Sequence, residues 1–397
     1  MSLIYLDNNA TTRVAPEVLE AMLPYFKEEY ANPSSIYDFA KRSNHAIRDA
    51  RGVIKDFFNA ENEKEIIFTS CGSESANTAI RGVLNMNKNK RHIITTKVEH
   101  PCVLNLYSAL EKEGYIVDYI GVNSNGELDL AQLENAVTPD TALVSAMYAN
   151  NETGVIFPIQ KIAQIIKSKN SQTKFFVDAV QVTGKLKIDV QELGVDLMSI
   201  SGHKFHAPKG IGALYVNSKT LITPLIIGGH QERGKRAGTE NVPYIVGMAK
   251  AAELATDNLK YEATEIKRLR DKLETGILKN VFNSRVNGGI VNRVPNTTNI
   301  GFEYIEGELI LLHLSDLGIC ASSGSACTSG SLEPSHVLRA MNVPFTSMHG
   351  SIRFSLSKYT TEKEIDYVCE KMPGIIEKLV NISPFQDELN ALKRLRH

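Results

Sequence analysis

The chain has 397 residues, of which 43% are hydrophobic and 22% charged, and its formal net charge is -1. This composition is ordinary for a globular protein and excludes a disordered chain or a fibrous repeat. The charge balance provides no general basic surface for nucleic acid or anionic lipid, and no apolar run is long enough to predict a membrane span. The length predicts a large domain and a smaller one.

The first residues and the cysteines predict a cytoplasmic protein. The segment Met1–Asp7 lacks the basic and apolar regions of a signal peptide. The five cysteines are odd in number and contain no C-x-x-C pair. They therefore favour neither a disulfide framework nor a zinc site, and they suit a reducing compartment in which thiols stay free.

Short β-rich runs alternate with helical stretches between residues 60 and 216. The alternation predicts a doubly wound α/β domain with a mostly parallel sheet. Ligands of such sheets bind at the carboxyl ends of the strands, so the residues that follow each strand are the first candidates for a site. The predicted strands are 65–70, 92–96, 115–121, 142–147, 174–178, 196–201 and 211–216.

The pattern changes after the sheet. Residues 241–282 have the apolar spacing of a long helix, and an amphipathic segment at 306–317 belongs to a smaller α+β domain. Thr361 and Glu364 have the spacing of a capping box for another helix, and a short helix is expected after Pro384.

We predict three parts of the chain. Residues 1–15 are expected to pack with the small domain, residues 16–255 to form the large domain, and residues 256–397 to form the small domain. Residues 320–335 are rich in Ser and Gly and are expected to form a mobile loop.

Two strand ends carry a possible cofactor site. One predicted strand ends in Asp178, with Gln181 three residues later, and another leads into Ser201, His203 and Lys204. Taken singly, such an Asp is usually a turn or capping residue, and such a Lys is usually solvated. Together they provide an amine for an aldehyde, an acid for a ring nitrogen and donors for a phosphate, which are the requirements of pyridoxal phosphate.

Other polar residues follow strands toward the same edge. Gly72 and Ser73 lie between a strand and a helical run, where free backbone N–H groups can hold a phosphate, although an ordinary βα turn has the same pattern. His100 could stack on a flat cofactor or move protons, although a single histidine is usually structural. Asn151 is a turn residue by default.

Arg353 lies in an apolar strand-like run, where an unpaired charge would be costly. A bidentate partner such as a substrate carboxylate would satisfy it.

Cys327 differs from the other cysteines because its neighbours are small and polar, which predicts a reachable and reactive thiol. Cys102 and Cys369 lie in predicted helices and Cys320 ends an apolar run, so we expect these three to be buried and inert.

These motifs resemble the class I cysteine desulfurases of the NifS/IscS type, within the class-V aminotransferase family. The matching runs are Asp178–Gln181, Ser201–Lys204, Arg236–Thr239 and Gly324–Cys327, and the opening Tyr5–Thr12 is similar to the NifS branch. The likeness extends over nearly the whole chain. Ser73 departs from the commoner threonine, and Tyr37 stands where many relatives have a histidine.

The resemblance implies an aspartate-aminotransferase-type fold, a homodimer and pyridoxal phosphate as cofactor. Lys204 would bind the aldehyde of the cofactor, Asp178 would face its ring nitrogen, Gln181 its ring hydroxyl, and His100 would stack on the ring. The implied phosphate contacts are Gly72, Ser73, Ser201, His203 and Thr239 of the partner subunit.

The resemblance also implies the reaction. Asn151, which would contact the cofactor as well, and Arg353 would hold the carboxylate of L-cysteine, and Cys327 would accept its sulfur as a persulfide, leaving L-alanine. An iron–sulfur scaffold protein or another acceptor would then take the sulfur, with no nucleic acid or membrane involved. We expect no resident metal, although Cys327 could transiently ligate an iron–sulfur cluster.

Two other interpretations remain open. A different pyridoxal-phosphate reaction, such as transamination or selenocysteine cleavage, needs Lys204 and Asp178 but no reactive thiol. A sulfur or iron–sulfur carrier would use Cys327 only as a docking ligand.

Overall fold

The structure is a computed structural model of the chain, and it describes residues 3–323 and 334–395. Cys327 lies outside the described residues. Within them, none of the helices has the length and apolar character needed to cross a membrane.

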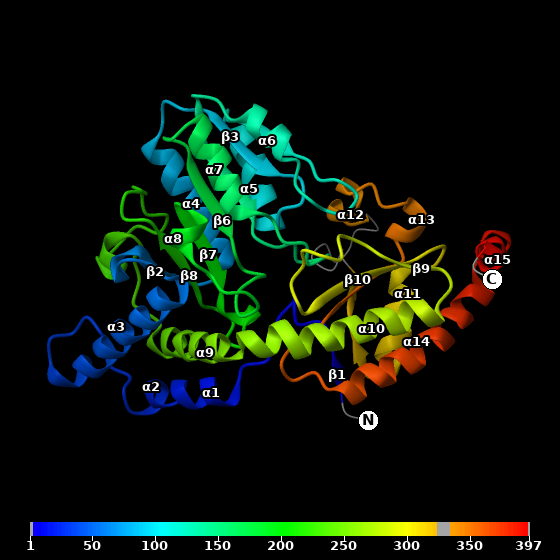
Figure 1. Cartoon of the computed structure of the whole chain (residues 1–397). Helices are drawn as coiled ribbons and strands as arrows, with labels where there is room; N and C mark the ends of the chain where they lie inside the picture. The colour runs from blue at the N-terminus through cyan, green and yellow to red at the C-terminus, as the bar shows by residue number, and fades with distance from the viewer. Residues whose placement is uncertain (1–2, 324–333, 396–397) are drawn as a thin grey trace.

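The larger part of the molecule is built on a seven-stranded sheet with the order β2-β8-β7-β6-β5-β3-β4 (Figure 1). Strands β3 to β7 are parallel, whereas β8 is antiparallel to both of its neighbours. All seven predicted strands are confirmed to within one residue at each end. The strands are β2 (Ile66–Thr69), β3 (His92–Thr96), β4 (Ile116–Ile120), β5 (Thr141–Met147), β6 (Lys174–Asp178), β7 (Leu197–Ser201) and β8 (Gly212–Val216).

Helices cover both faces of this sheet. Because side chains alternate along a strand, Phe175 packs with one cluster of helices and Phe176 with the other. Both rings are fully buried, which explains why these strands are continuous apolar runs. The helices are α1 (Pro16–Met22), α2 (Pro24–Lys27), α3 (Asp38–Phe58), α4 (Gly72–Met86), α5 (Pro101–Lys112), α6 (Leu130–Ala136), α7 (Ile159–Lys169) and α8 (Val190–Leu193).

A long helix connects the two parts of the molecule (Figure 1). It consists of α9 (Val242–Tyr261), one π-helical turn (Glu262–Ile266) and α10 (Lys267–Asn280). The predicted helix over 241–282 is therefore confirmed, with an irregular turn that the apolar spacing did not indicate.

The smaller part has an antiparallel sheet with the order β12-β13-β10-β9, covered by helices that enclose a core of their own. Its α14 (Glu362–Ile382) begins with the predicted capping box of Thr361 and Glu364. The remaining elements are β9 (Ser284–Val286), β10 (Thr297–Phe302), α11 (Gly307–Asp316), β11 (Ile319–Cys320), β12 (Ser322–Ser323), α12 (His336–Ala340), α13 (Phe345–Met348), β13 (Ser351–Ser355) and α15 (Gln386–Leu395). The start of the predicted loop 320–335 is thus paired strand, because β12 binds the backbone of β13.

The N-terminal segment contacts both parts. Strand β1 (Ile4–Tyr5) pairs with β11 in the smaller part. Further along, the backbone N–H of Thr12 donates to the carbonyl of His203, which follows β7. Residues 9–12 are thereby placed at the edge of the large sheet, while the domain division at residues 15 and 255 stays a prediction.

Candidate active site

A cavity of about 300 Å³ lies at the carboxyl ends of β5, β6 and β7. Nine of the predicted site residues line it, from three strand ends and two helix starts. They are Gly72, Ser73, His100, Asn151, Asp178, Gln181, Ser201, His203 and Lys204. The volume is at the lower end of the range for small-ligand sites.

Asp178 provides a buried acid in this cavity. It ends β6 between β5 and β7, and its Oδ1 accepts the backbone N–H of Val180 at 2.9 Å. Burial raises the pKa of Asp178, while the nearby His100 and Lys204 act in the opposite direction. A cationic ring nitrogen in the cavity would stabilise the ionised carboxylate.

His100 provides a flat and neutral ring. It caps α5, and its Nδ1 accepts the backbone N–H of Cys102 at 3.2 Å, so the proton of the neutral ring is on Nε2. Burial lowers the pKa of His100, with Asp178 acting in the opposite direction. An uncharged ring at the cavity wall suits stacking on a flat ligand.

The start of α4 provides an anion site. This 15-residue helix begins at Gly72, and the Sγ of its capping residue Cys71 accepts the backbone N–H of Glu74 at 3.4 Å. The remaining N–H groups of the first turn are available to an anion. A Cβ at Gly72 would lie 3.1 Å from Cγ2 of Val180, so glycine keeps this wall open.

Ser201 and His203 lie beside that helix start and line the same cavity. Ser201 is the last residue of β7, and His203 follows in a short 3-10 turn. Burial and the charge of Lys204 lower the pKa of His203 to about 4, so its ring is a neutral hydrogen-bonding group at physiological pH.

Lys204 is held by the N-terminal segment. Its Nζ donates to the backbone carbonyls of Asn9 at 2.6 Å and Ala10 at 2.9 Å. Gln181 Nε2 donates to the same Asn9 carbonyl at 3.2 Å. A single backbone carbonyl therefore joins two of the predicted cofactor contacts.

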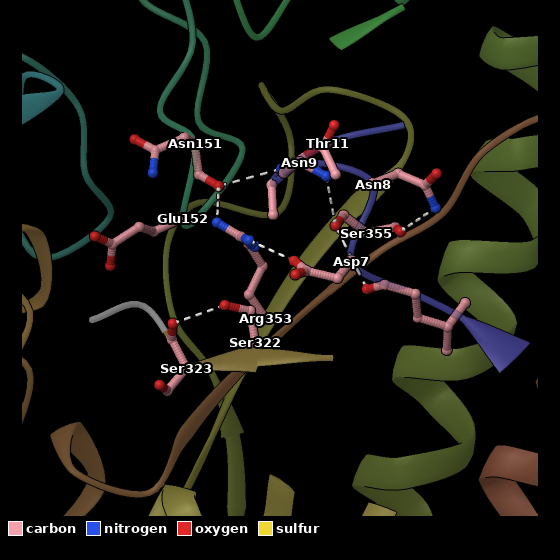
Figure 2. Close-up of polar contacts among 12 residues, drawn as sticks. Asp7, Asn8, Asn9, Thr11, Asn151, Glu152, Ser322, Ser323, Arg353 and Ser355 are labelled. Carbon is pink, nitrogen blue, oxygen red and sulfur yellow. Dashed lines mark hydrogen bonds and ion pairs between the residues drawn. The ribbon is translucent and has the colours of Figure 1, made fainter. Parts of the chain in front are cut away.

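Asn9 is a site residue that the sequence analysis missed. It is 2% exposed, and its Nδ2 donates to the carbonyl of Asn151 at 3.1 Å (Figure 2). The same Nδ2 also donates to Thr297 Oγ1 at 2.9 Å. The available signal was the polar run Asp7–Thr12 directly after a short apolar segment. Such a run at a strand end has the same character as the runs that identified Asp178.

Arg353 has a charged partner within the chain. It lies on β13, its Nη2 contacts Asp7 Oδ1 at 2.6 Å, and its Nη1 donates to the carbonyl of Asn151 at 3.1 Å (Figure 2). The Nε of Arg353 is buried and has no hydrogen-bond partner among the described residues. The role of Arg353 toward a substrate carboxylate stays a prediction.

The remaining predicted residues lie elsewhere. Thr239 is exposed in the loop before α9 and does not line the cavity of its own chain. Cys102 does line the cavity, and Cys102, Cys320 and Cys369 are half-buried, so the expectation that they are fully buried is wrong. Burial nevertheless raises the pKa of all three thiols, which disfavours the reactive thiolate.

These residues fit pyridoxal phosphate. The cavity combines a lysine amine, a buried carboxyl, a neutral ring and a helix start with glycine at its first position. Among residues 3–323 and 334–395, no group of three or more His, Cys, Asp or Glu side chains could hold a metal ion.

The comparisons with known proteins agree with this geometry. The family model described as aminotransferase class-V matches residues 4–368. The chain belongs to this family, among its NifS-type cysteine desulfurases.

Individual relatives match over nearly their whole length. The chain is 57% identical over 388 residues to "Cysteine desulfurase" from Nostoc sp., which covers 98% of this chain and 96% of the relative. It is 51% identical to "Cysteine desulfurase NifS" from Azotobacter vinelandii, with 97% and 95% covered. A solved structure titled "NIFS-LIKE PROTEIN" superposes with a TM-score of 0.90 at 41% identity, covering 95% of this chain and all of that chain.

Proposed function

We propose that this chain is a pyridoxal-phosphate-dependent cysteine desulfurase, which removes sulfur from L-cysteine and carries it as a persulfide on Cys327. The observation that carries the proposal is the meeting of Lys204, Asp178 and the start of α4 in one cavity. The names and identities of the relatives support the same reaction.

The cofactor would be held at three points. Lys204 binds its aldehyde, Asp178 keeps the ring nitrogen protonated, and Gln181 bonds the ring hydroxyl, with His100 against the ring. Pyridoxal phosphate supplies a carbonyl carbon for the substrate amine and a protonated ring that withdraws electrons from the substrate's α-carbon. The proposed phosphate contacts are Gly72, Ser73, Ser201, His203 and Thr239 of the partner subunit.

Lys204 would also move the proton. The Nζ of Lys204 would act as a general base and accept the proton from the substrate's α-carbon. Asn151 and Arg353 would orient the substrate by its carboxylate. The buried Nε of Arg353 supports this assignment, because no residue in 3–323 or 334–395 forms a hydrogen bond with it.

Cys327 would perform the sulfur transfer. Its thiolate attacks the sulfur of L-cysteine, an S–S bond forms, and the substrate C–S bond breaks. The carbon product takes up a proton and leaves as L-alanine, while Cys327 retains the sulfur as a persulfide. Oxidation states balance without an added redox partner, because the electron pair of the broken C–S bond stays with carbon.

The partners and location belong to the same proposal. We infer a homodimer, because Thr239 is exposed and is not among the residues that line its own chain's cavity. The acceptor would be an iron–sulfur scaffold protein or another sulfur-binding protein. The free thiols of the four described cysteines support a reducing cytoplasmic location.

Mass spectrometry after treatment with L-cysteine tests the reaction. We expect one added sulfur atom on the peptide that contains Cys327, and L-alanine in the solution. In Cys327→Ala, cofactor binding should be retained, whereas L-alanine formation should fall to background. Normal turnover in that variant, or a keto acid as the product, would contradict the proposal and favour another pyridoxal-phosphate reaction. Cys369→Ala is the matched control.

A further inference from the structure

A second and smaller cavity lies against Lys204. Its volume is about 30 Å³, and Lys204 lines both this cavity and the larger one. Because one water needs roughly 10–15 Å³ of this volume and several polar partners, the space suits one or two waters. Its polar lining includes Asn8, Lys185, Glu262 and Asn296.

Glu262 is the only carboxylate among the described residues that line this cavity. It is the first residue of the π-helical turn between α9 and α10, and such turns often occur at functional sites. Its side chain is buried, and within the part of the chain that the structure describes its Oε2 has no hydrogen-bond partner. Burial raises the pKa of Glu262 to about 7, while Lys185 and Lys358 act to lower it. A buried carboxylate oxygen of this kind needs a donor, which a water in the cavity would provide.

Lys185 provides a positive charge that interacts with Glu262. It is buried, and its Nζ donates to Gln181 O at 2.9 Å, Gln181 Oε1 at 3.2 Å and Asn9 Oδ1 at 3.2 Å. Burial lowers the pKa of Lys185 to about 7, with Glu262 acting in the opposite direction. Lys185 therefore donates hydrogen bonds to both Gln181 and Asn9, which are bonded to each other beside Lys204.

The other ionisable groups around the cavity are basic. His206 lines it but is neutral at physiological pH, because burial lowers its pKa to about 4. Lys358 lines it from the smaller part of the molecule, and the charge of Arg353 acts on Lys185 from the same side. Within this cavity, ionised Glu262 would favour a proton on Lys204, as the carboxylate of Asp178 does from the larger cavity.

We propose that this cavity holds one or two waters that connect Lys204 with Glu262, and that Glu262 and Lys185 regulate the proton on Lys204. A proton on the Nζ of Lys204 can pass through water to the carboxylate of Glu262, so that an ammonium and a carboxylate become an amine and a carboxylic acid with no change in total charge. Glu262 and Lys185 are positioning residues, because they act on the reaction only through Lys204. The inference rests on the proposed role of Lys204.

A pH titration of the cofactor absorbance in the holoenzyme tests the inference. The absorbance of pyridoxal phosphate bound to Lys204 reports the protonation of the lysine nitrogen. Removing the negative charge in Glu262→Gln should lower the apparent pKa of that transition by about one pH unit, and removing the positive charge in Lys185→Met should raise it by a similar amount. In the double variant, the apparent pKa of the transition should return toward that of the wild type.

The control is Glu265→Gln, which lies in the same π-helical turn but pairs with Arg268 at the surface, and its titration should match the wild type. Unchanged titrations in both single variants, or shifts in the same direction, would overturn the relay. If Glu262→Gln does not fold, the direction of the shift in apparent pKa in Lys185→Met alone tests the inference. A high-resolution structure without water beside Glu262 would also overturn it. A wild type whose absorbance ignores borohydride would instead contradict the proposed function.

Discussion

Lys204 separates two regions of different character. On one side, Asp178, His100 and Ser201 come from strand ends and helix starts and face a cavity large enough for a small ligand. On the other side, Lys185 lines a space sufficient only for water and donates a hydrogen bond to Asn9. The first region keeps its hydrogen-bonding capacity for a ligand, whereas most polar groups of the second satisfy each other.

This difference predicts different consequences of mutation. Polar side chains whose partner would be a ligand contribute to the reaction. They can destabilise the ligand-free fold, because burying a charge without a partner is unfavourable. Groups that satisfy each other stabilise the fold, because each lost partner leaves a buried polar atom without a hydrogen bond.

The largest effect is expected for Asp178→Asn, in the first region. The amide cannot keep a ring nitrogen protonated, so the rate of L-alanine formation should fall by at least about 100-fold. The cofactor-free protein should be no less stable than the wild type, since burial raises the pKa of Asp178 and its charge is unfavourable there. Enzyme kinetics and urea unfolding of the cofactor-free protein measure the two quantities, and the control is Asp189→Asn, at a half-buried position that caps α8 outside the cavity. A large loss of stability would show that Asp178 belongs to the folding network instead.

A smaller effect is expected for Asn9→Ala, at the border of the two regions. The change removes one buried hydrogen bond each from Lys185, Asn296 and Thr297, which keep their other partners. The free energy of unfolding of the cofactor-free protein should decrease by about 2–3 kcal/mol.

Urea unfolding measures this change. The control is Asn280→Ala, which removes a single exposed hydrogen bond to Gly276. A decrease no larger than in this control would mean that the contacts of Asn9 do not stabilise the fold.

The two regions also differ in how far the sequence predicts them. Asp178 and Lys204 could be predicted because parallel strands bring their carboxyl ends to one edge, so the order along the chain gives the place in space. The antiparallel direction of β8 was not indicated, since its apolar run is like those of its parallel neighbours.

The second region depends on contacts between distant segments. The pair of Asp7 and Arg353 joins positions 346 residues apart, which no local pattern reveals. Lys185 and Lys187 occupy one short basic stretch, yet only Lys185 is buried. Their difference arises from the N-terminal segment, whose Asn9 accepts a hydrogen bond from Lys185.

A pH-dependent effect is expected for Glu99→Gln, which lies next to the first region but binds no ligand. Glu99 Oε1 accepts hydrogen bonds from Thr96 and from the backbone of Met147, while Oε2 is buried without a partner. Burial raises the pKa of Glu99 to about 8 from its ordinary value of 4.5. The folded protein therefore binds a proton that the unfolded chain releases, and stability from this group falls as the pH rises from 4.5 to 8. The slope is at most about 1.4 kcal/mol per pH unit.

In Glu99→Gln this part of the pH dependence should disappear, because the amide does not titrate. Urea unfolding at several pH values between 5 and 8 measures the difference between variant and wild type. The variant should gain stability relative to the wild type as the pH rises, whatever its stability at pH 5. The exposed Glu111→Gln, whose carboxylate contacts only Tyr119, should show no such trend. Parallel curves for Glu99→Gln and the wild type would mean that Glu99 is ionised in the folded protein, and that a polar partner stabilises its charge beside Asp178.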